Sequence, residues 1–245
     1  MVKIIAHRGS SGEAPQNTMY AFRKAVADGA DAIETDVRKT KDGVLIIMHD
    51  STPKRLAGEQ YAGFDVTKMT YDEIKDIDIS SKAFPDLPAQ HIPRLSDLLE
   101  LVRETGIEVN IELKGNQDID DGLEYDVVKA VEEYGVRDKI FYSCFDHTML
   151  ANVLKANPDA KVAPLYINSM YKVESYARAM GAFAIHPEYN NFLLRGDFDS
   201  VRRAGLEINV WTVNSPIYAQ KLVSAGATGL ITNFPVQIRR AIEEM

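Results

Sequence analysis

Features that are absent from this sequence narrow the choice of protein class. The only cysteine is Cys144, so an intrachain disulfide is impossible and a reducing compartment is indicated. There is no apolar run near the roughly 20 residues that a membrane span needs, and the N-terminus reaches a polar cluster at His7 too soon for a signal peptide. We therefore expect a cytoplasmic protein without stable membrane association.

Basic residues are also outnumbered. The net charge of −8 argues against a nucleic-acid partner, because neutralising a phosphate backbone needs a clustered Lys/Arg surface. A small phosphate ester remains an allowed ligand, since its binding depends on local charge. The sequence leaves the oligomeric state open, and a homo-oligomer is compatible with it.

Short β-rich runs alternate with helical stretches along almost the whole chain, which predicts parallel strands joined by crossover helices. The expected strands are Lys3–Ala6, Ala32–Val37, Val44–Met48, Glu108–Leu113, Ile140–Cys144, Lys161–Leu165, Phe183–Ile185, Glu207–Val213 and Gly229–Thr232. The expected helices include Asn17–Asp28, Leu95–Thr105, Leu123–Tyr134, Asp146–Ala156 and Ser215–Ser224, with Asn17 as an N-cap.

One of these nine strands is explained by a hairpin. Thr40-Lys41-Asp42-Gly43 is a turn signal that makes Val44–Met48 an antiparallel return strand, and eight strands remain for a (β/α)8 TIM barrel. The competing fold is an open doubly wound sheet, which usually has a Gly-rich phosphate loop after its first strand, and none is present. We expect residues 1–245 to form a single catalytic domain, with residues 50–93 as an insertion after the second strand.

Charged residues gather where the barrel strands end, which is where such barrels place their active sites. Glu34 and Asp36 share one face of their strand, and Glu112 and Lys114 share a face of the next. Three carboxylates at one mouth would repel each other unless a cation lay among them, and oxygen ligands favour Mg²⁺ or Ca²⁺ over Zn²⁺. The sequence therefore predicts one divalent cation held by these three acidic residues.

Two histidines accompany the carboxylates. His7 follows the first strand, and a two-residue turn at Asp42-Gly43 would place His49 directly opposite Asp36, whereas a three-residue loop would place it opposite Thr35. Such a pair suits a general base and a general acid in phosphodiester cleavage.

Two basic side chains lie at the same rim. Three carboxylates with one divalent cation would still repel an anion, so Arg8 and Lys114 are needed to hold a phosphate. Of the other candidates, Ser143 could donate a hydrogen bond to substrate and Cys144 is expected to be packing. Three histidines are expected to be structural or at the surface: His91, His147 and His186.

With these residues, the sequence resembles the glycerophosphodiester phosphodiesterase family. The matching segments follow the family order over essentially the whole chain: Ala6-His7-Arg8-Gly9, Pro15-Gln16-Asn17-Thr18, 29–37, Thr40-Lys41-Asp42-Gly43, His49-Asp50, Ile92-Pro93-Arg94-Leu95, Ile111-Glu112-Leu113-Lys114 and Trp211-Thr212-Val213-Asn214.

The resemblance implies metal-dependent hydrolysis of a glycerophosphodiester to glycerol 3-phosphate and an alcohol. It implies a cation on Glu34, Asp36 and Glu112, an acid/base pair in His7 and His49, phosphate contacts from Arg8 and Lys114, and a glycerol contact from Trp211. The chain departs from the family pattern at Gln16, where Glu is usual, and at Asn233, where Asp is usual.

Two alternatives stay open. The first is a related barrel phosphodiesterase, similar to a phospholipase D, that acts on lipid headgroups at a membrane. The second is a catalytically silent barrel that only binds a metal or ligand. Residues 50–93 contain no basic amphipathic run, which disfavours the first. The presence of both His7 and His49 disfavours the second.

Overall fold

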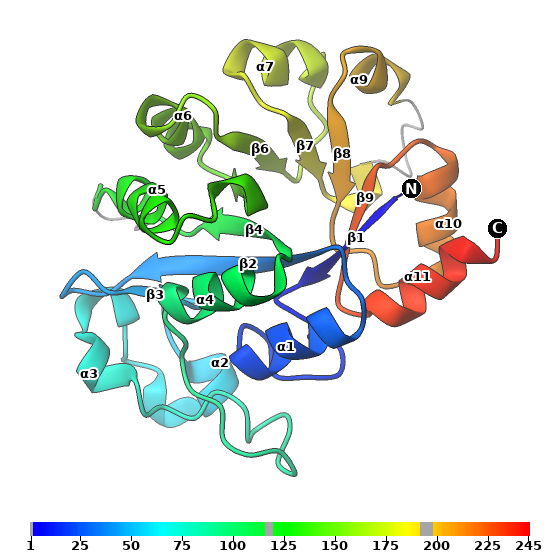
Figure 1. Cartoon of the computed structure of the whole chain (residues 1–245). Coiled ribbons are helices and arrows are strands. Elements are labelled where there is room, and N and C mark those ends of the chain that lie inside the picture. Colours follow the sequence, from blue (N-terminus) through cyan, green and yellow to red (C-terminus); the bar gives the residue numbers. More distant parts are fainter. Residues whose placement is uncertain (1, 116–119, 192–197) are drawn as a thin grey trace.

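A closed barrel of eight parallel strands forms the centre of the computed structural model, which describes residues 2–115, 120–191 and 198–245 (Figure 1). The barrel strands are β1 (Lys3–His7), β2 (Ala32–Lys39), β4 (Glu108–Leu113), β5 (Ile140–Cys144), β6 (Lys161–Tyr166), β7 (Ala184–Pro187), β8 (Glu207–Val210) and β9 (Gly229–Thr232). They pair in the order β1-β9-β8-β7-β6-β5-β4-β2, and pairing of β1 with β2 closes the ring. The predicted TIM barrel is confirmed.

Helices surround the barrel (Figure 1). They are α1 (Met19–Ala27), α4 (Leu95–Thr105), α5 (Leu123–Glu133), α6 (His147–Ala156), α7 (Val173–Met180), α9 (Asp199–Arg203), α10 (Pro216–Ser224) and α11 (Pro235–Glu243), with a 3-10 turn, η3 (Arg137–Lys139), before β5. Leucines at helical spacing bury one face of α4, and Gly106, with a φ of 72°, ends it in the left-handed conformation. The main core lies between the helices and the strands, and a smaller apolar cluster inside the barrel includes Ile5, Phe141 and Ile231.

The register of the hairpin after β2 is one of the two that the sequence left open. β3 (Leu45–Ile47) is antiparallel to β2, with Val37 opposite Ile47, and Met48 N donates to Asp36 O at 2.9 Å. Met48 therefore lies opposite Asp36, so of the two alternatives for His49 the structure has the one that a three-residue loop predicts. The reason is a three-residue loop that ends in Gly43 with a φ of 83°, the alternative left open by the sequence.

Residues 50–93 lie beside β3 and contain only short helices (Figure 1). These are α2 (Lys54–Ala57), η1 (Glu59–Tyr61), η2 (Val66–Lys68) and α3 (Tyr71–Ile74). They pack around an apolar cluster of their own, which includes Met48, Ile74 and Ile92. This cluster fixes the segment against the barrel next to β3.

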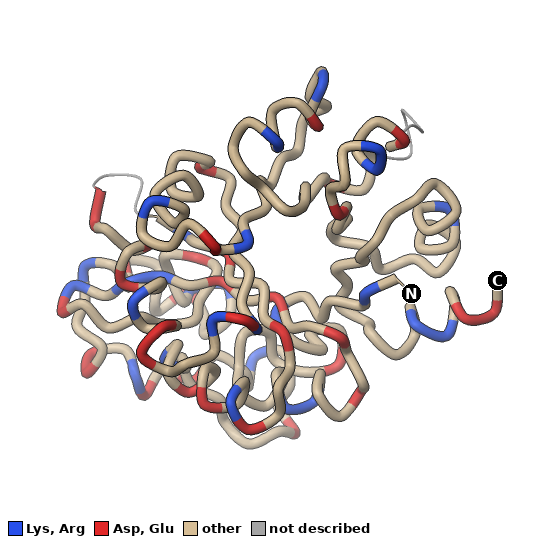
Figure 2. Tube along the Cα trace, turned by 45° about the horizontal axis from the view of Figure 1, so that its top comes forward, with Lys and Arg blue, Asp and Glu red and all other residues tan. Residues whose placement is uncertain are grey.

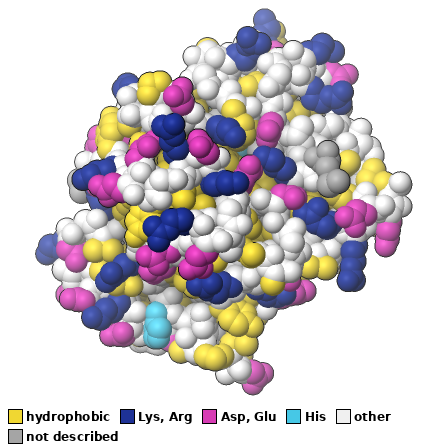
Figure 3. Space-filling view, in the orientation of Figure 1, with side chains coloured by type: hydrophobic (Ala, Val, Ile, Leu, Met, Phe, Trp, Pro, Cys, Tyr) yellow, Lys and Arg dark blue, Asp and Glu magenta, His cyan; other side chains and the backbone are white. Residues whose placement is uncertain are grey.

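Charged residues of both signs are interspersed along the trace (Figure 2), and their side chains are intermixed on the face seen in Figure 3. In the described part of the chain, every helix is too short or too polar to cross a bilayer.

Candidate active site

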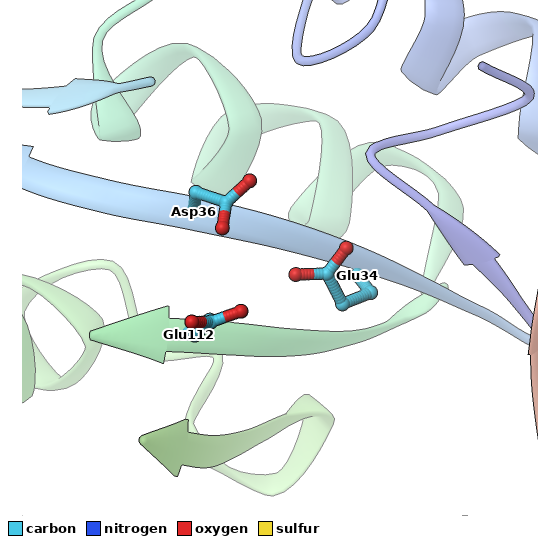
Figure 4. Close-up of side chains that lie close together, drawn as sticks. All are labelled: Glu34, Asp36 and Glu112. Atoms are coloured by element: carbon cyan, nitrogen blue, oxygen red, sulfur yellow. The ribbon is translucent and has the colours of Figure 1, made fainter. Parts of the chain in front are cut away.

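Three carboxylates meet at the mouth of the barrel (Figure 4). Glu34 and Asp36 point to the same side of β2, and the parallel register places Glu112 of β4 beside Asp36. One oxygen from each of the three lies within 4.8 Å of the others, and the residues are only 3%, 0% and 8% exposed. We refer to Glu34, Asp36 and Glu112 as the acidic triad.

Asp36 is the most heavily paired member of the triad. Arg8 Nε lies 3.1 Å from Oδ2, Lys114 Nζ lies 3.3 Å from Oδ1, and Asn17 Nδ2 donates to Oδ2 at 2.8 Å. Burial opposes ionisation of Asp36, but the charges of Arg8 and Lys114 outweigh it and hold the pKa of this carboxyl below its ordinary value. Asp36 is therefore a permanent anion at the centre of the site.

The pKa values of the other two triad members are shifted in the opposite direction. Burial, and then the charges of Asp36 and Glu112, raises the pKa of Glu34 well above its ordinary value. Burial and the Asp36 charge raise the pKa of Glu112 to about 7, although Lys114 pairs with it. Glu34 Oε1 has no hydrogen-bond partner in the described part of the chain. A hard divalent cation fits this set, because it would relieve the repulsion and use the unpaired oxygen.

The loop after β1 places Arg8 against the triad. Its backbone N–H donates to Glu34 Oε2 at 3.0 Å, and its Nη1 donates to Gln16 Oε1 at 2.7 Å. The next residue must be glycine, because Gly9 has a φ of 79° and a Cβ there would lie 2.7 Å from the Ala21 carbonyl carbon. Gln16, one of the two departures from the family pattern, therefore orients Arg8 directly.

His7, at the end of β1, is hydrogen-bonded to Asn233, the second departure from the family pattern. Its Nδ1 lies 2.7 Å from Asn233 Oδ1, and because an amide oxygen only accepts, Nδ1 carries the proton and Nε2 is free of one. Burial, and then the charge of Arg8, lowers the pKa of His7 to about 4. At neutral pH its Nε2, which lies 3.8 Å from Glu34 Oε2, can accept a proton.

His49 reaches the mouth from the end of the hairpin. Its Nδ1 donates to Asp50 Oδ1 at 2.6 Å, and Arg55 Nε binds the other oxygen of Asp50, also at 2.6 Å. The hydrogen bond from His49, together with Arg55, holds the pKa of Asp50 below its ordinary value. The backbone of His49 is fixed from β2, because Arg38 Nη2 donates to its carbonyl oxygen at 2.7 Å.

A cavity of about 100 Å³ opens between these groups. Trp211 forms part of its wall, anchored by its Nε1, which donates to His186 O at 2.8 Å, and packed edge-on against Phe145 at 5.5 Å between ring centroids. The cavity is lined by His7, Arg8, Glu34, His49, Asn110, Glu112, Lys114, Ser143, Phe145, Leu165, Trp211, Thr212 and Ile231. Seven of the eight expected site residues therefore line one cavity, and the eighth, Asp36, lies against it.

The remaining candidates lie elsewhere, except Ser143, which lines the cavity. Cys144 is buried packing, and burial raises the pKa of its thiol to about 12. His147 bonds to the Tyr176 hydroxyl and to a backbone carbonyl, and His91 is exposed. His186 is buried inside the barrel and bonded to Asn209.

Three contacts were not expected from the sequence. Asn17 is not an N-cap, because Thr18 caps α1, and a φ of 56° at Asn17 turns its side chain to Asp36 instead. Asp50 and Arg55 support His49. The adjacency of Asp50 to His49 was a visible signal, whereas the left-handed backbone of Asn17 had none.

The (β/α)8 barrel therefore carries a buried acidic triad that could hold a metal ion, with His7 and His49 beside it in one cavity. The model of the glycerophosphoryl diester phosphodiesterase family matches residues 7–237. The chain belongs to this family.

Several relatives align with almost the whole chain. A glycerophosphodiester phosphodiesterase of Caldanaerobacter subterraneus subsp. tengcongensis is 34% identical, covering 95% of this chain and 94% of that protein, and one of Bacillus altitudinis is 34% identical, covering 100% of both. The crystal structure of an Agrobacterium tumefaciens glycerophosphodiester phosphodiesterase superposes with a TM-score of 0.83 at 27% identity, covering 98% of this chain and 100% of that one. An Oleispira antarctica phosphodiesterase in complex with the product sn-glycerol-3-phosphate gives a TM-score of 0.85 at 25% identity, covering 98% and 96%.

Proposed function

We propose that this chain hydrolyses glycerophosphodiesters to glycerol 3-phosphate and an alcohol, with one divalent cation, Mg²⁺ or Ca²⁺, held by Glu34, Asp36 and Glu112. The observation that carries the proposal is that the three buried carboxylates of the triad lie at one small cavity that Arg8 and Lys114 also line. The product bound to the Oleispira antarctica relative supports the choice of substrate. When bound, the cation would polarise a phosphoryl oxygen and stabilise the charge that develops on it.

Arg8 and Lys114 are proposed to bind the phosphate. Both line the cavity, and each lies within ion-pair distance of Asp36, so their charges are directed at the same point. An arginine can also bind two phosphate oxygens at once, which would fix the orientation of the diester. Trp211 is proposed to pack against the C–H face of the glycerol unit.

His7 and His49 are proposed as the acid/base pair. His7 is neutral at neutral pH with its Nε2 free of a proton, which suits a general base. The Asp50 carboxylate accepts a hydrogen bond from His49 Nδ1 and so fixes the orientation of the ring, and His49 is proposed as the general acid that protonates the leaving oxygen. The nucleophile is water or the substrate's own glycerol hydroxyl, and the second route passes through a cyclic phosphate.

Phosphorus NMR of glycerophosphocholine hydrolysis tests the reaction and the route together. We expect glycerol 3-phosphate to accumulate with Mg²⁺ or Ca²⁺ and not with a chelator. The variants His7→Ala and His49→Ala should lose about 10²- to 10⁴-fold in kcat. His91→Ala is the matched control, because this histidine is exposed and outside the cavity. Full activity in either of the first two variants would overturn the assignment.

The same experiment separates the two rival functions. Turnover that requires phospholipid vesicles and spares soluble diesters would favour the lipid-headgroup enzyme. Cation and glycerol 3-phosphate binding without turnover of any diester would favour the silent barrel.

A further inference from the structure

Four buried polar side chains lie inside the barrel, where bulky apolar residues are usual. They are Asn110, Ser143, His186 and Asn209, each 0–1% exposed. His186 Nε2 and Asn209 Nδ2 lie 3.1 Å apart and share a hydrogen bond. Each of the four nevertheless has one buried polar atom with no partner among the described residues: Asn110 Oδ1, Ser143 Oγ, His186 Nδ1 and Asn209 Oδ1.

Only Asn110 and Ser143 face the active-site cavity. Asn110 precedes Glu112 by two residues on β4, so it points to the same side one layer deeper in the barrel. Ser143 lies on β5 opposite Glu112 in the parallel register. The pair therefore forms a polar patch beside the acidic triad, since Asn110 also lies opposite Glu34 in the register of β2 and β4. The walls beside it are apolar, with Leu165 and Ile231.

The unpaired atoms indicate which chemical group would bind there. Asn110 Oδ1 can only accept a hydrogen bond, whereas the Ser143 hydroxyl can donate or accept. A ligand hydroxyl can donate to the first and accept from the second. An anion would be repelled by the nearby carboxylates. The cavity of about 100 Å³ is larger than a single water needs, so it has room for a small organic group.

We propose that Asn110 and Ser143 bind the terminal hydroxyl of the glycerol unit and determine specificity for it. This inference rests on the proposed glycerophosphodiesterase function and deepens it. With the phosphate at Arg8 and Lys114, the terminal hydroxyl is the substrate oxygen farthest from phosphorus, so it reaches deepest into the barrel. A polyol bound in this way would give both atoms a hydrogen-bond partner.

A pair of substrates that differ in one oxygen tests the proposal. The first is glycerophosphocholine, and the second is the matched diester of propane-1,2-diol, in which a methyl group replaces the terminal CH₂OH. A site that hydrogen-bonds a substrate hydroxyl rejects the analogue that lacks it, so we expect kcat/KM of the wild type to favour the first by about a hundredfold or more. Asn110→Ala and Ser143→Ala should each reduce this ratio about tenfold or more. A ratio is insensitive to damage that slows both substrates equally.

Asn209→Ala is the matched control. Asn209 is the same residue type with the same 1% exposure and the same unpaired oxygen as Asn110, but it does not line the cavity. Its ratio should remain that of the wild type, whatever happens to its melting temperature. If Asn110→Ala fails to fold, Ser143→Ala decides alone, since it removes a single oxygen atom.

The outcomes distinguish a failure of this inference from a failure of the proposed function. A wild type that hydrolyses both diesters equally, or an Asn209→Ala variant that loses as much selectivity as the cavity variants, would overturn this inference and leave the proposed function standing. A wild type that hydrolyses neither diester would overturn both.

Discussion

Cation binding at the acidic triad should weaken as the pH falls, because Glu112 takes up a proton near neutrality. Its pKa is raised to about 7 by burial and by the Asp36 charge. A proton and a cation compete for the same carboxylate, so binding must release the proton. One group with a pKa of about 7 is roughly ten-elevenths protonated at about pH 6 and one-eleventh protonated at about pH 8, which predicts a rise in affinity of about tenfold across this range. Glu34, whose pKa is also raised, would make the rise steeper.

Isothermal titration of Mg²⁺ and Ca²⁺ checks this at both pH values, in two buffers that differ in ionisation enthalpy so that released protons are counted. Glu112→Gln should weaken binding and flatten the dependence on pH. Glu124→Gln is the control, because Glu124 is another buried glutamate, bonded to Asn152 and outside the triad. Equal affinity at the two pH values with no proton release would refute the reasoning.

The raised pKa of Glu112 also makes the stability of the cation-free protein depend on pH. Without a cation, the folded protein keeps a proton on Glu112 up to about pH 7, whereas the unfolded chain loses it near the ordinary value of 4.5. The unfolded state therefore binds fewer protons between these values, and the free energy of unfolding should fall as the pH rises through them, by about 3 kcal/mol at most. Urea unfolding with and without saturating cation measures the loss, which the cation should remove.

Three substitutions probe the surroundings of the triad. Asp50→Asn removes the carboxylate that orients the His49 ring and should lower kcat about tenfold or more with little change in KM, so an unchanged kcat in steady-state kinetics would contradict its positioning role. Asn17→Ala deprives the buried Asp36 of a hydrogen bond and should cost about 1–3 kcal/mol of unfolding free energy in urea, a loss that must exceed that of an exposed asparagine. Trp211→Leu should raise KM more than it lowers kcat and weaken inhibition by glycerol 3-phosphate, whereas an unchanged KM would reduce Trp211 to barrel packing.

The barrel could be predicted because its signal is periodic: eight apolar runs alternate with amphipathic helices, and a turn signal accounts for the ninth strand. Strand ends were less predictable. β7 continues through His186 to Pro187, although the proline had indicated a loop. β8 ends at Val210, so the expected strand was three residues too long. The register of the hairpin depended on one residue in the loop, which composition does not determine.

The residue types at the strand ends were enough to predict that the triad and both histidines lie together at one site. The contacts that orient them were not predictable, since they arise from loop conformations without a period. Asn17 shows this: its sequence context favoured a helix cap, but a positive φ turns it to Asp36. The partners of Arg8 and Lys114 were also unexpected, because both were assigned only to a phosphate and both pair with Asp36.

That pairing explains how one site can attract a cation and an anion in turn. With its three carboxylates ionised, the triad outweighs Arg8 and Lys114 by one negative charge, so the site favours a cation and repels a phosphodiester. A divalent cation reverses the balance to one positive charge, and it also competes with Arg8 and Lys114 for Asp36. The two basic side chains then have charge to offer a phosphodiester, whose single negative charge brings the sum to zero. On the proposed function, each ligand would therefore strengthen the binding of the other, and by linkage the factor would be the same in both directions.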